Sequence, residues 1–383
     1  MDLRARRRLY VVIIVIVISA GFFGLTTYAW RASRRYFPET GVVANKQQLL
    51  DRGSAYYICD SIAGHIHQPD VVIDVVWEEH PGGGFTMRTN NLGFREDAAT
   101  SQAKPAGSIR VLVTGDSHID GAVGNSESFP NQLEQLLNAT YDVPEFEVDN
   151  GATGHYGPQN YVGFLRKYAY LEPDIYMVVF YTGNDFMDAI KIASWQDKSL
   201  SASLKMGRIQ RLAYLGRLFA ASRICHGGVS QALNSIFFFK HRPKMRETAL
   251  AISCQQIEEI RGICLRTGIR LIVVLLPARA GIKPDVTDWR FNAARRLLSI
   301  RADDLVLSRE MADSLAAWLT RSNINCVDLA RCMEEDTGKD YFWEADYHLN
   351  HIGHRLAAEA VWSSCRPVFQ MSTAGCRMPT YKK

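Results

Sequence analysis

The chain has 383 residues, of which 47% are hydrophobic and 22% are charged, and its formal net charge is +4. This length allows one large domain with an extension, or two modest domains, and a substantial core. The basic excess is small and is concentrated near the N-terminus and in one internal stretch. A nucleic-acid-binding surface is therefore not expected.

Residues 1–37 predict a membrane anchor. Residues 9–30 form an uncharged apolar run with arginines on both sides. A helix of about 20 apolar residues can cross a bilayer, whereas the apolar region of a cleavable signal peptide usually has about 7–15 residues. We therefore favour an uncleaved single-pass anchor over a signal peptide, with the N-terminus in the cytoplasm and the large domain exported.

Changes in composition predict four parts along the chain. Residues 38–105 mix turn-rich and strand-like pieces, including residues 71–77, and predict an extension packed on the main domain. The parts are a tail and anchor (1–37), the N-terminal extension (38–105), the main domain (106–370) and a C-terminal tail (371–383).

Short β-branched runs alternate with helical stretches from Ile109 onward. Runs this apolar imply a parallel sheet with helices on both faces, because each strand is buried on both sides. The sequence therefore predicts an α/β fold with a central parallel sheet of about five strands. These strands are Ile109–Thr114, Phe146–Asn150, Ile175–Tyr181, residues 271–276 and Asn325–Asp328.

Residues 202–246 form an insertion in which every charged residue is basic. Leucine and isoleucine recur there at roughly helical spacing, which predicts an amphipathic helix. Such a helix could lie against anionic headgroups or a polyanionic substrate. The alternative is a solvated helix that covers the sheet. The apolar positions are Leu204, Ile209, Leu212, Leu215 and Leu218.

The eight cysteines form no CxxC pair, which gives little support to a zinc-ribbon or thioredoxin-like protein. In an exported domain some cysteines could form disulfides, and Cys326 with Cys332 is the first pair to consider. The alternative is that most are small buried apolar residues, which we favour for Cys254 and Cys264.

Ser117 follows the first predicted strand directly, in the segment Gly-Asp-Ser-His, and residues 128–137 predict the next helix. Ligands of an open parallel sheet bind outside the carboxyl ends of the strands. A serine on this strand-to-helix turn can project its hydroxyl into a cleft where backbone N–H groups converge. The same three residue types are also common in ordinary turns.

Two further loops follow predicted strands at the same edge of the sheet. The second strand leads into a glycine-rich loop that contains Gly154, whose backbone could approach a ligand closely. The third strand leads to Asn184, which would place an amide donor there. Either loop alone is also consistent with a simple turn.

An acidic residue precedes a histidine by two positions near the C-terminus, at Asp346 and His348. A carboxylate can hold an imidazole in the tautomer that accepts a proton from serine. Together, His348, His351 and His354 could instead form a metal site, but their three-residue spacing lacks the acidic helix signature of a zinc protease. We favour the proton relay and expect no metal or cofactor.

This ordered set resembles the SGNH/GDSL hydrolase superfamily, whose members carry a Ser, a Gly, an Asn and an Asp/His pair in four blocks. The resemblance covers roughly residues 86–365. Residues 91–95 and 127–130 are similar to bacterial members with an N-terminal extension. The resemblance implies a three-layer flavodoxin-like fold. The matching residues are Ser117, Gly154, Asn184, Asp346 and His348.

Two blocks depart from the usual pattern of the superfamily. A single residue separates Asp346 from His348, which resembles the Asp-x-His block of exopolysaccharide O-acetyltransferase-like relatives. The third block lacks the residue that usually stands between the glycine and Asn184. Asn184 remains the natural match.

The resemblance implies acyl transfer by a covalent acyl-enzyme. His348 would take the proton of Ser117, Asp346 would orient His348, and an oxyanion hole would comprise the backbone N–H groups of Ser117 and Gly154 and the side chain of Asn184. His118 and His155 adjoin these residues and are candidates for substrate contact.

The sequence thus predicts a membrane-anchored serine esterase that acts on O-acetyl esters of carbohydrate. Transfer of an acetyl group to polysaccharide is an alternative, as is a lipase or thioesterase. A degenerate SGNH domain that binds glycan without catalysis belongs to a different class of function. A flavodoxin-like binding domain has less support, because no glycine-rich dinucleotide motif follows the first strand.

Overall fold

The computed structural model describes residues 56–141, 145–225, 227–283, 288–335, 338–345 and 347–376. The predicted anchor in residues 1–37 and the predicted catalytic Asp346 lie outside the described residues. Within the described ranges, no helix combines the length and the apolar character that a membrane span requires.

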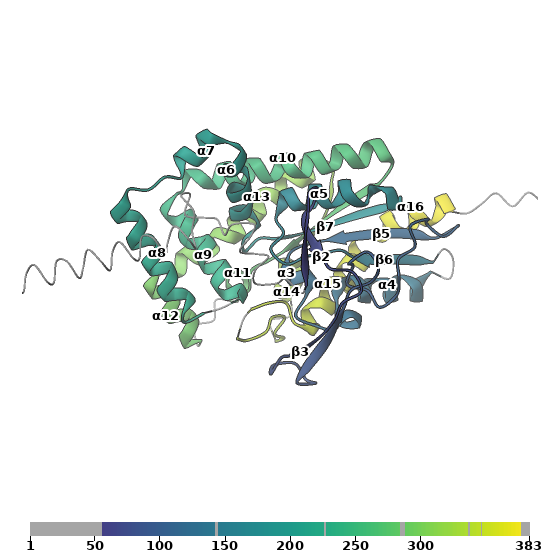
Figure 1. The fold of residues 1–383 in the computed structure, drawn as a ribbon, viewed down its shortest axis with the longest axis horizontal. Coiled ribbons are helices and arrows are strands. Elements are labelled where there is room, and N and C mark those ends of the chain that lie inside the picture. Colours follow the sequence, from purple (N-terminus) through teal and green to yellow (C-terminus); the bar gives the residue numbers. More distant parts are fainter. Residues whose placement is uncertain are drawn as a thin grey trace, which may run out of the picture.

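A parallel sheet of five strands forms the centre of the molecule, as the sequence predicts (Figure 1). The strand order is β6-β5-β7-β8-β9, and every residue of β5 and β7 is buried. The strands are β5 (Ile109–Thr114), β6 (Phe146–Asn150), β7 (Ile175–Tyr181), β8 (Arg270–Leu276) and β9 (Asn325–Asp328).

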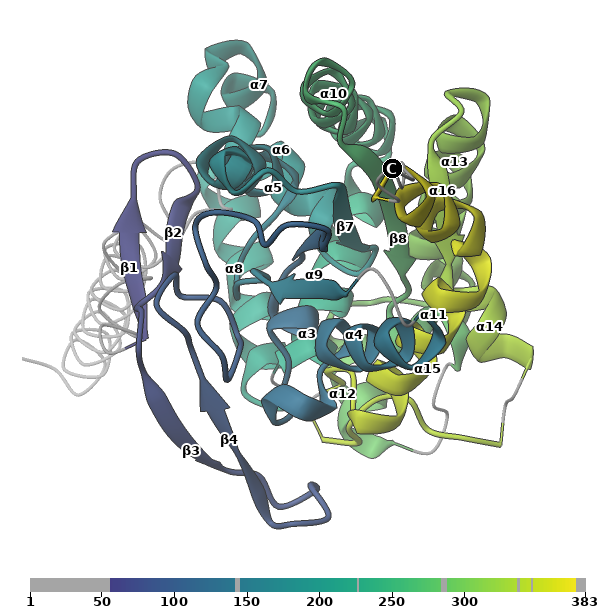
Figure 2. The same cartoon turned by 90° about the vertical axis from the view of Figure 1, so that its right-hand side faces the viewer.

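Helices cover both faces of the sheet, which confirms the three-layer α/β architecture (Figure 2). Along β7, Met177 and Val179 face one helical layer, whereas Val178 and Phe180 face the other, because successive side chains of a strand alternate. One layer contains α4 (Phe129–Thr140), α14 (Leu329–Glu335), α15 (His351–Ser364) and α16 (Arg366–Cys376). The other contains α5 (Pro158–Tyr168), α6 (Asp185–Gln196), α10 (Lys244–Thr267) and α13 (Leu307–Arg321).

The N-terminal extension contains two antiparallel hairpins that lie beside the sheet domain (Figure 2). The first hairpin packs on α5, where Asn160 Nδ2 donates to the Ala63 carbonyl at 2.8 Å. The second hairpin projects from the body of the molecule in Figure 1. The hairpins are β1 (Tyr57–Asp60) with β2 (Gly64–His67), and β3 (Val72–Val76) with β4 (Gly84–Arg88).

The basic insertion is helical, but α8 packs against α9 and α12 rather than directly on the sheet. Of the leucines and isoleucine that predicted the amphipathic helix, only Leu215 is buried within α8, and Ile209 is 83% exposed. Leu204 is buried, but it lies outside α8 as the C-cap of α7. The helices are α7 (Lys198–Ser203), α8 (Arg208–Ser222), α9 (Gly227–His241) and α12 (Trp289–Leu297).

Shorter elements complete the fold. The disulfide that we considered between Cys326 and Cys332 is not formed. Cys326 on β9 and Cys332 on α14 are both free thiols, and Cys332 Sγ instead lies 3.9 Å from the Asp328 carbonyl. The boundary expected at residue 370 falls inside α16, which continues to Cys376. The remaining elements are α3 (Ser117–Asp120), η1 (Asn125–Glu127), η2 (Ala169–Leu171), α11 (Arg279–Ile282) and η3 (Ala302–Val306).

Candidate active site

Ser117 begins the short helix α3 immediately after β5, at the carboxyl edge of the sheet. The Asp116 side chain accepts from the backbone N–H of His118 at 2.9 Å and so caps this helix. Gly115 allows the tight turn, because a Cβ atom there would lie 2.9 Å from Ile119 Cγ1. Ser117 is only half-buried, so its hydroxyl faces accessible space.

His348 reaches Ser117 from the other end of the chain. The Ser117 Oγ and His348 Nε2 atoms are 2.9 Å apart, although 231 residues separate them in the sequence. Trp343 N donates to the His348 carbonyl at 2.8 Å, and the side chain of Asn350 holds the carbonyls of Asp340 and Phe342. The structure therefore brings the predicted nucleophile and base into hydrogen-bond contact.

His118 lies behind this pair and supports the loop that carries His348. Its buried ring stacks 3.8 Å from that of Tyr181 and 4.6 Å from that of His348. Its Nδ1 atom accepts from the backbone N–H of Leu349 at 3.3 Å. Burial, together with the nearby His348, holds the pKa of His118 well below its usual value, which keeps the ring neutral. These contacts hold His118 against the loop of His348. His155, the other candidate for substrate contact, is exposed beside Gly154.

The neighbour of the predicted catalytic acid is tightly held, although Asp346 itself is not described. Tyr347 Oη donates to Asp288 Oδ2 at 2.8 Å, and the Arg279 guanidinium lies 4.1 Å from the centre of the Tyr347 ring. The role of Asp346 as the residue that orients His348 stays a prediction.

The histidines that suggested a metal site point to separate partners. His348 bonds to Ser117, whereas His354 Nδ1 accepts from the backbone N–H of Phe129 at 3.0 Å. His351 lies near His80, with ring centres 6.2 Å apart. Across the described ranges, no group of three or more His, Cys, Asp or Glu side chains is arranged to hold a metal ion.

Gly154 and Asn184 lie at the expected strand ends, but both have donors that already contact carboxylates. The Gly154 backbone N–H donates to Asp120 Oδ2 at 3.1 Å. Asn184, the N-cap of α6, donates from Nδ2 to Asp188 Oδ2 at 3.1 Å. An amide NH₂ has a second hydrogen, so Asn184 can still donate to a substrate oxygen, whereas Gly154 has no second N–H. Their place in an oxyanion hole stays a prediction.

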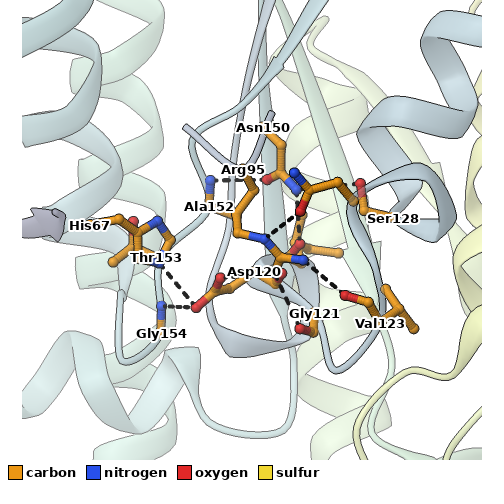
Figure 3. Close-up of polar contacts among 12 residues, drawn as sticks. His67, Arg95, Asp120, Gly121, Val123, Ser128, Asn150, Ala152, Thr153 and Gly154 are labelled. Carbon is orange, nitrogen blue, oxygen red and sulfur yellow. Dashed lines mark hydrogen bonds and ion pairs between the residues drawn. The ribbon is translucent and has the colours of Figure 1, made fainter. Parts of the chain in front are cut away.

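Asp120 is the functional candidate that sequence reasoning missed (Figure 3). Its buried carboxylate binds the Gly154 amide, lies 3.2 Å from His67 Nε2 and 3.3 Å from Arg95 Nη1, and accepts from Tyr56 and Tyr57. Burial alone would raise the pKa of Asp120, but His67 and Arg95 hold it well below its usual range. The sequence feature that could have pointed to Asp120 is its place in α3, three residues after Ser117.

A buried carboxyl also lies behind the nucleophile, at Asp116. Burial raises the pKa of Asp116 to about 7. Asp185 is also buried, accepts from Tyr161 Oη at 2.8 Å and has a raised pKa for the same reason. Burial therefore disfavours the charged form of both carboxyls beside Ser117.

Part of the chain matches a known protein family. Residues 238–377 match the sequence model of a family described as the SGNH hydrolase-like domain of acetyltransferase AlgX. This range contains His348 and α10 to α16 but not Ser117. No curated protein matches the chain.

Several solved structures resemble the chain at low identity. A member of the lipolytic protein G-D-S-L family from Veillonella parvula has 15% identity and a TM-score of 0.36, covering 67% of this chain and 97% of that one. A catalytic mutant of Axe2, an acetylxylan esterase from Geobacillus stearothermophilus, has 11% identity and a TM-score of 0.35, covering 68% and 95%. A two-domain esterase active on acetylated mannans has 12% identity and a TM-score of 0.36, covering 72% and 53%.

Values this low carry no argument about activity. Of the residues in the four-block pattern, the family match covers Asp346 and His348, whereas Ser117, Gly154 and Asn184 precede it. Residues 238–377 are thus similar to an SGNH hydrolase-like domain, and His348 within this range contacts Ser117, which directly follows β5 and Asp116.

Proposed function

We propose that the protein is a membrane-anchored serine esterase that hydrolyses O-acetyl esters of carbohydrate. The observation that carries this proposal is the 2.9 Å contact between Ser117 Oγ and His348 Nε2 at the carboxyl edge of the sheet. A serine in hydrogen-bond contact with a base is the arrangement that nucleophilic acyl transfer requires.

The proposed reaction has two steps. His348 takes the Ser117 proton while Ser117 Oγ attacks the ester carbonyl, and the protonated His348 then gives that proton to the departing sugar hydroxyl. Water, deprotonated by the same His348, releases acetate from the acyl-enzyme and restores Ser117. Asp346 would orient His348 and stabilise its protonated form.

The oxyanion that forms in each step needs hydrogen-bond donors. Ser117 is the first residue of α3, and a backbone N–H in the first turn of a helix has no partner within that helix. The second hydrogen of Asn184 Nδ2 supplies another donor. We propose these two donors for the oxyanion, with Gly154 able to join them only if its amide leaves Asp120.

Transfer of acetyl to a sugar hydroxyl is the second candidate function. The family description, which names an acetyltransferase, favours it. The first step is the same, and a sugar hydroxyl then replaces water as the acceptor. The Asp-x-His spacing resembles exopolysaccharide O-acetyltransferase-like relatives, so it also fits transfer.

A substrate panel tests the activity and separates the two reactions. We expect a fluorophosphonate probe to label the wild-type chain and not Ser117→Ala, and acetylated glycans to release acetate. Acetyl transfer to an unacetylated glycan at the expense of acetate release would favour the transferase. No labelling of the folded wild-type chain would reject a serine enzyme and leave a glycan-binding scaffold.

The anchor and the exported location are part of the same proposal and rest on residues 9–30. The uncharged run is long enough to cross a bilayer, and the flanking arginines favour a cytoplasmic N-terminus. Protease treatment of intact spheroplasts should digest the catalytic domain and leave a short protected fragment. Full protection of the catalytic domain would reject this orientation.

A further inference from the structure

The two hairpins of the N-terminal extension contact the two loops that flank Ser117. The second hairpin touches the loop of His348, and the first touches the loop of Gly154. We propose that the extension positions the active site, with Glu79 as a positioning residue for His348 and with Tyr57 and His65 as positioning residues for Gly154. This inference rests on the proposed acyl-transfer function.

Glu79 holds the backbone just before the predicted catalytic acid and base. Its carboxylate accepts from the backbone N–H of Glu344 and, at 3.0 Å, from that of Ala345. Glu79 follows β3 in the turn of the second hairpin, more than 260 residues away in the sequence. One side chain therefore fixes two consecutive peptide groups of the loop that continues into His348.

The same hairpin also packs aromatic side chains on this loop. Trp77 and His80 lie 6.2 and 5.9 Å from the ring of Trp343, measured between ring centres. Trp343 Nε1 donates to the Ala122 carbonyl at 3.1 Å, close to the end of α3. Trp343 is thus held between the extension and the helix of the nucleophile.

The loop needs this external support because it contains little regular structure of its own. Between Asp340 and Asn350 its described residues form only an isolated β-bridge, Phe342 with Leu349. An irregular loop on the surface is mobile unless other groups satisfy its backbone. A base must stay within about 3 Å of its proton donor to act. Glu79 therefore helps to keep His348 in reach of Ser117.

The first hairpin binds the Gly154 carbonyl directly and reaches the Gly154 N–H through Asp120 of α3. His65 Nε2 donates to the Gly154 carbonyl at 2.7 Å, while the Gly154 N–H binds Asp120. Burial lowers the pKa of His65 to about 4, so the ring is neutral near pH 7 and carries its proton on Nε2 to make this bond. Tyr57 Oη donates to the same Asp120 oxygen at 3.1 Å. The loop behind Ser117 is thereby tied to the extension.

The decisive experiment substitutes Glu79 in the full chain. Glu79→Ala removes both acceptors and should lower kcat by about 10-fold with KM nearly unchanged, less than the ~10²-fold loss that misplacement by about 1 Å can cause. Glu79→Gln keeps one acceptor oxygen and should restore part of the rate. Hydrogen exchange at the amides of Glu344 and Ala345 should be fastest in Glu79→Ala, slower in Glu79→Gln and slowest in the wild type. Glu78→Gln, on the exposed face of the same turn, is the matched control and should match the wild type.

A second substitution tests the Gly154 side without removing a buried charge. Tyr57→Phe should lower kcat by about threefold and accelerate exchange at Gly154, since it loses one hydrogen bond to Asp120 and keeps the ring. Tyr170→Phe changes a half-exposed tyrosine without this bond and serves as its control.

The exchange measurement separates this inference from the proposed function. Exchange at residues 344 and 345 that is the same in Glu79→Ala and Glu78→Gln would overturn the inference, whether or not the chain is an esterase. Faster exchange with an unchanged kcat would overturn the positioning role. Failure of the fluorophosphonate probe to label wild-type Ser117 would reject the esterase. Faster exchange in Glu79→Ala would then still support the contact of Glu79 with the loop, but not a role of that contact in catalysis.

Discussion

β7 buries all its residues between two helical layers, whereas β3 alternates between exposed and half-buried residues along one edge of the molecule. The sheet is held by apolar side chains on both faces, and the hairpins are held to it by polar contacts such as those of Glu79 and Asp120. This difference between apolar packing and polar contacts indicates that the two regions have different structural roles. The sheet fixes where the strand ends meet, and the hairpins fix the loops that leave them.

The largest expected effect concerns the chemistry at the edge of the sheet. Ser117→Ala removes the nucleophile and should lower kcat on the order of 10⁶-fold, as loss of a nucleophile does in other serine enzymes. The free energy of unfolding should change by less than about 0.5 kcal/mol, because Ser117 is half-buried and contributes no core packing. Hydrolysis assays with chemical denaturation check both numbers, and substantial residual activity would move the nucleophile elsewhere.

A pair of truncations contrasts the two kinds of strand directly. Phe180→Ala, in the buried β7, should cost about 3–5 kcal/mol of folding stability, because it removes a ring that packs on Phe186. Val76→Ala, in β3, should change stability by less than about 0.5 kcal/mol, since Val76 is 86% exposed. Urea denaturation of both variants measures the difference. Similar costs at the two positions would remove the contrast between sheet and hairpins.

The next effect tests whether the sheet edge supplies the oxyanion donor. Asn184→Ala should lower kcat by about 10²–10³-fold with little change in KM, because the donor acts only when negative charge develops. Asn138 is the control: it is a helical asparagine that pairs with both backbone groups of Phe146 at the opposite end of the sheet. Asn138→Ala should affect stability rather than kcat, and equal kcat losses in the two variants would leave Asn184 without a catalytic role.

The smallest effect is a pH dependence at the junction of sheet and extension. Asp149 on β6 is buried and accepts from Thr100 Oγ1, and burial raises its pKa from 3.8 to about 7. Its protonated form therefore stabilises the fold below about pH 4, and this contribution is lost as the pH rises through about 7.

Asp149→Asn removes this titration and keeps the shape of the side chain. When the pH rises from 5 to 8, the free energy of unfolding of the wild type should fall relative to that of the variant by roughly 2–3 kcal/mol, since one pKa unit corresponds to about 1.4 kcal/mol. Thermal unfolding of both proteins at the two pH values measures this shift. A constant difference between them would show that Asp149 is ionised throughout.

The sheet could be predicted because its signal is apolar and local. Four of the five strands have the predicted bounds, and β8 begins at Arg270 rather than at Leu271. Arginine at that position gives no β-branched signal, yet backbone pairing with Ile175 extends the strand. The helix of the basic insertion was less predictable. Periodicity shows which residues share a face, but it does not show whether that face meets the sheet or, as for α8, other helices.

The contact between Ser117 and His348 could be predicted from the resemblance to the four-block pattern, and parallel strand ends explain why Ser117 lies at the same edge as Gly154 and Asn184. The contacts of Glu79 and Asp120 could not. When a carboxylate binds backbone N–H groups of a distant segment, the sequence of that segment does not identify it as the partner, since every residue except proline has an N–H group. Asp120 and Glu79 therefore resemble ordinary surface acids in the sequence, and only the folded chain shows their partners.

The distance of 231 residues between nucleophile and base has a consequence for biosynthesis. A growing chain carries Ser117 long before His348 emerges, and large proteins fold progressively as they are made. Throughout that interval the serine lacks its proton acceptor and remains inert toward esters. The contact between the two side chains can therefore form only after the segment that contains His348 has been synthesised.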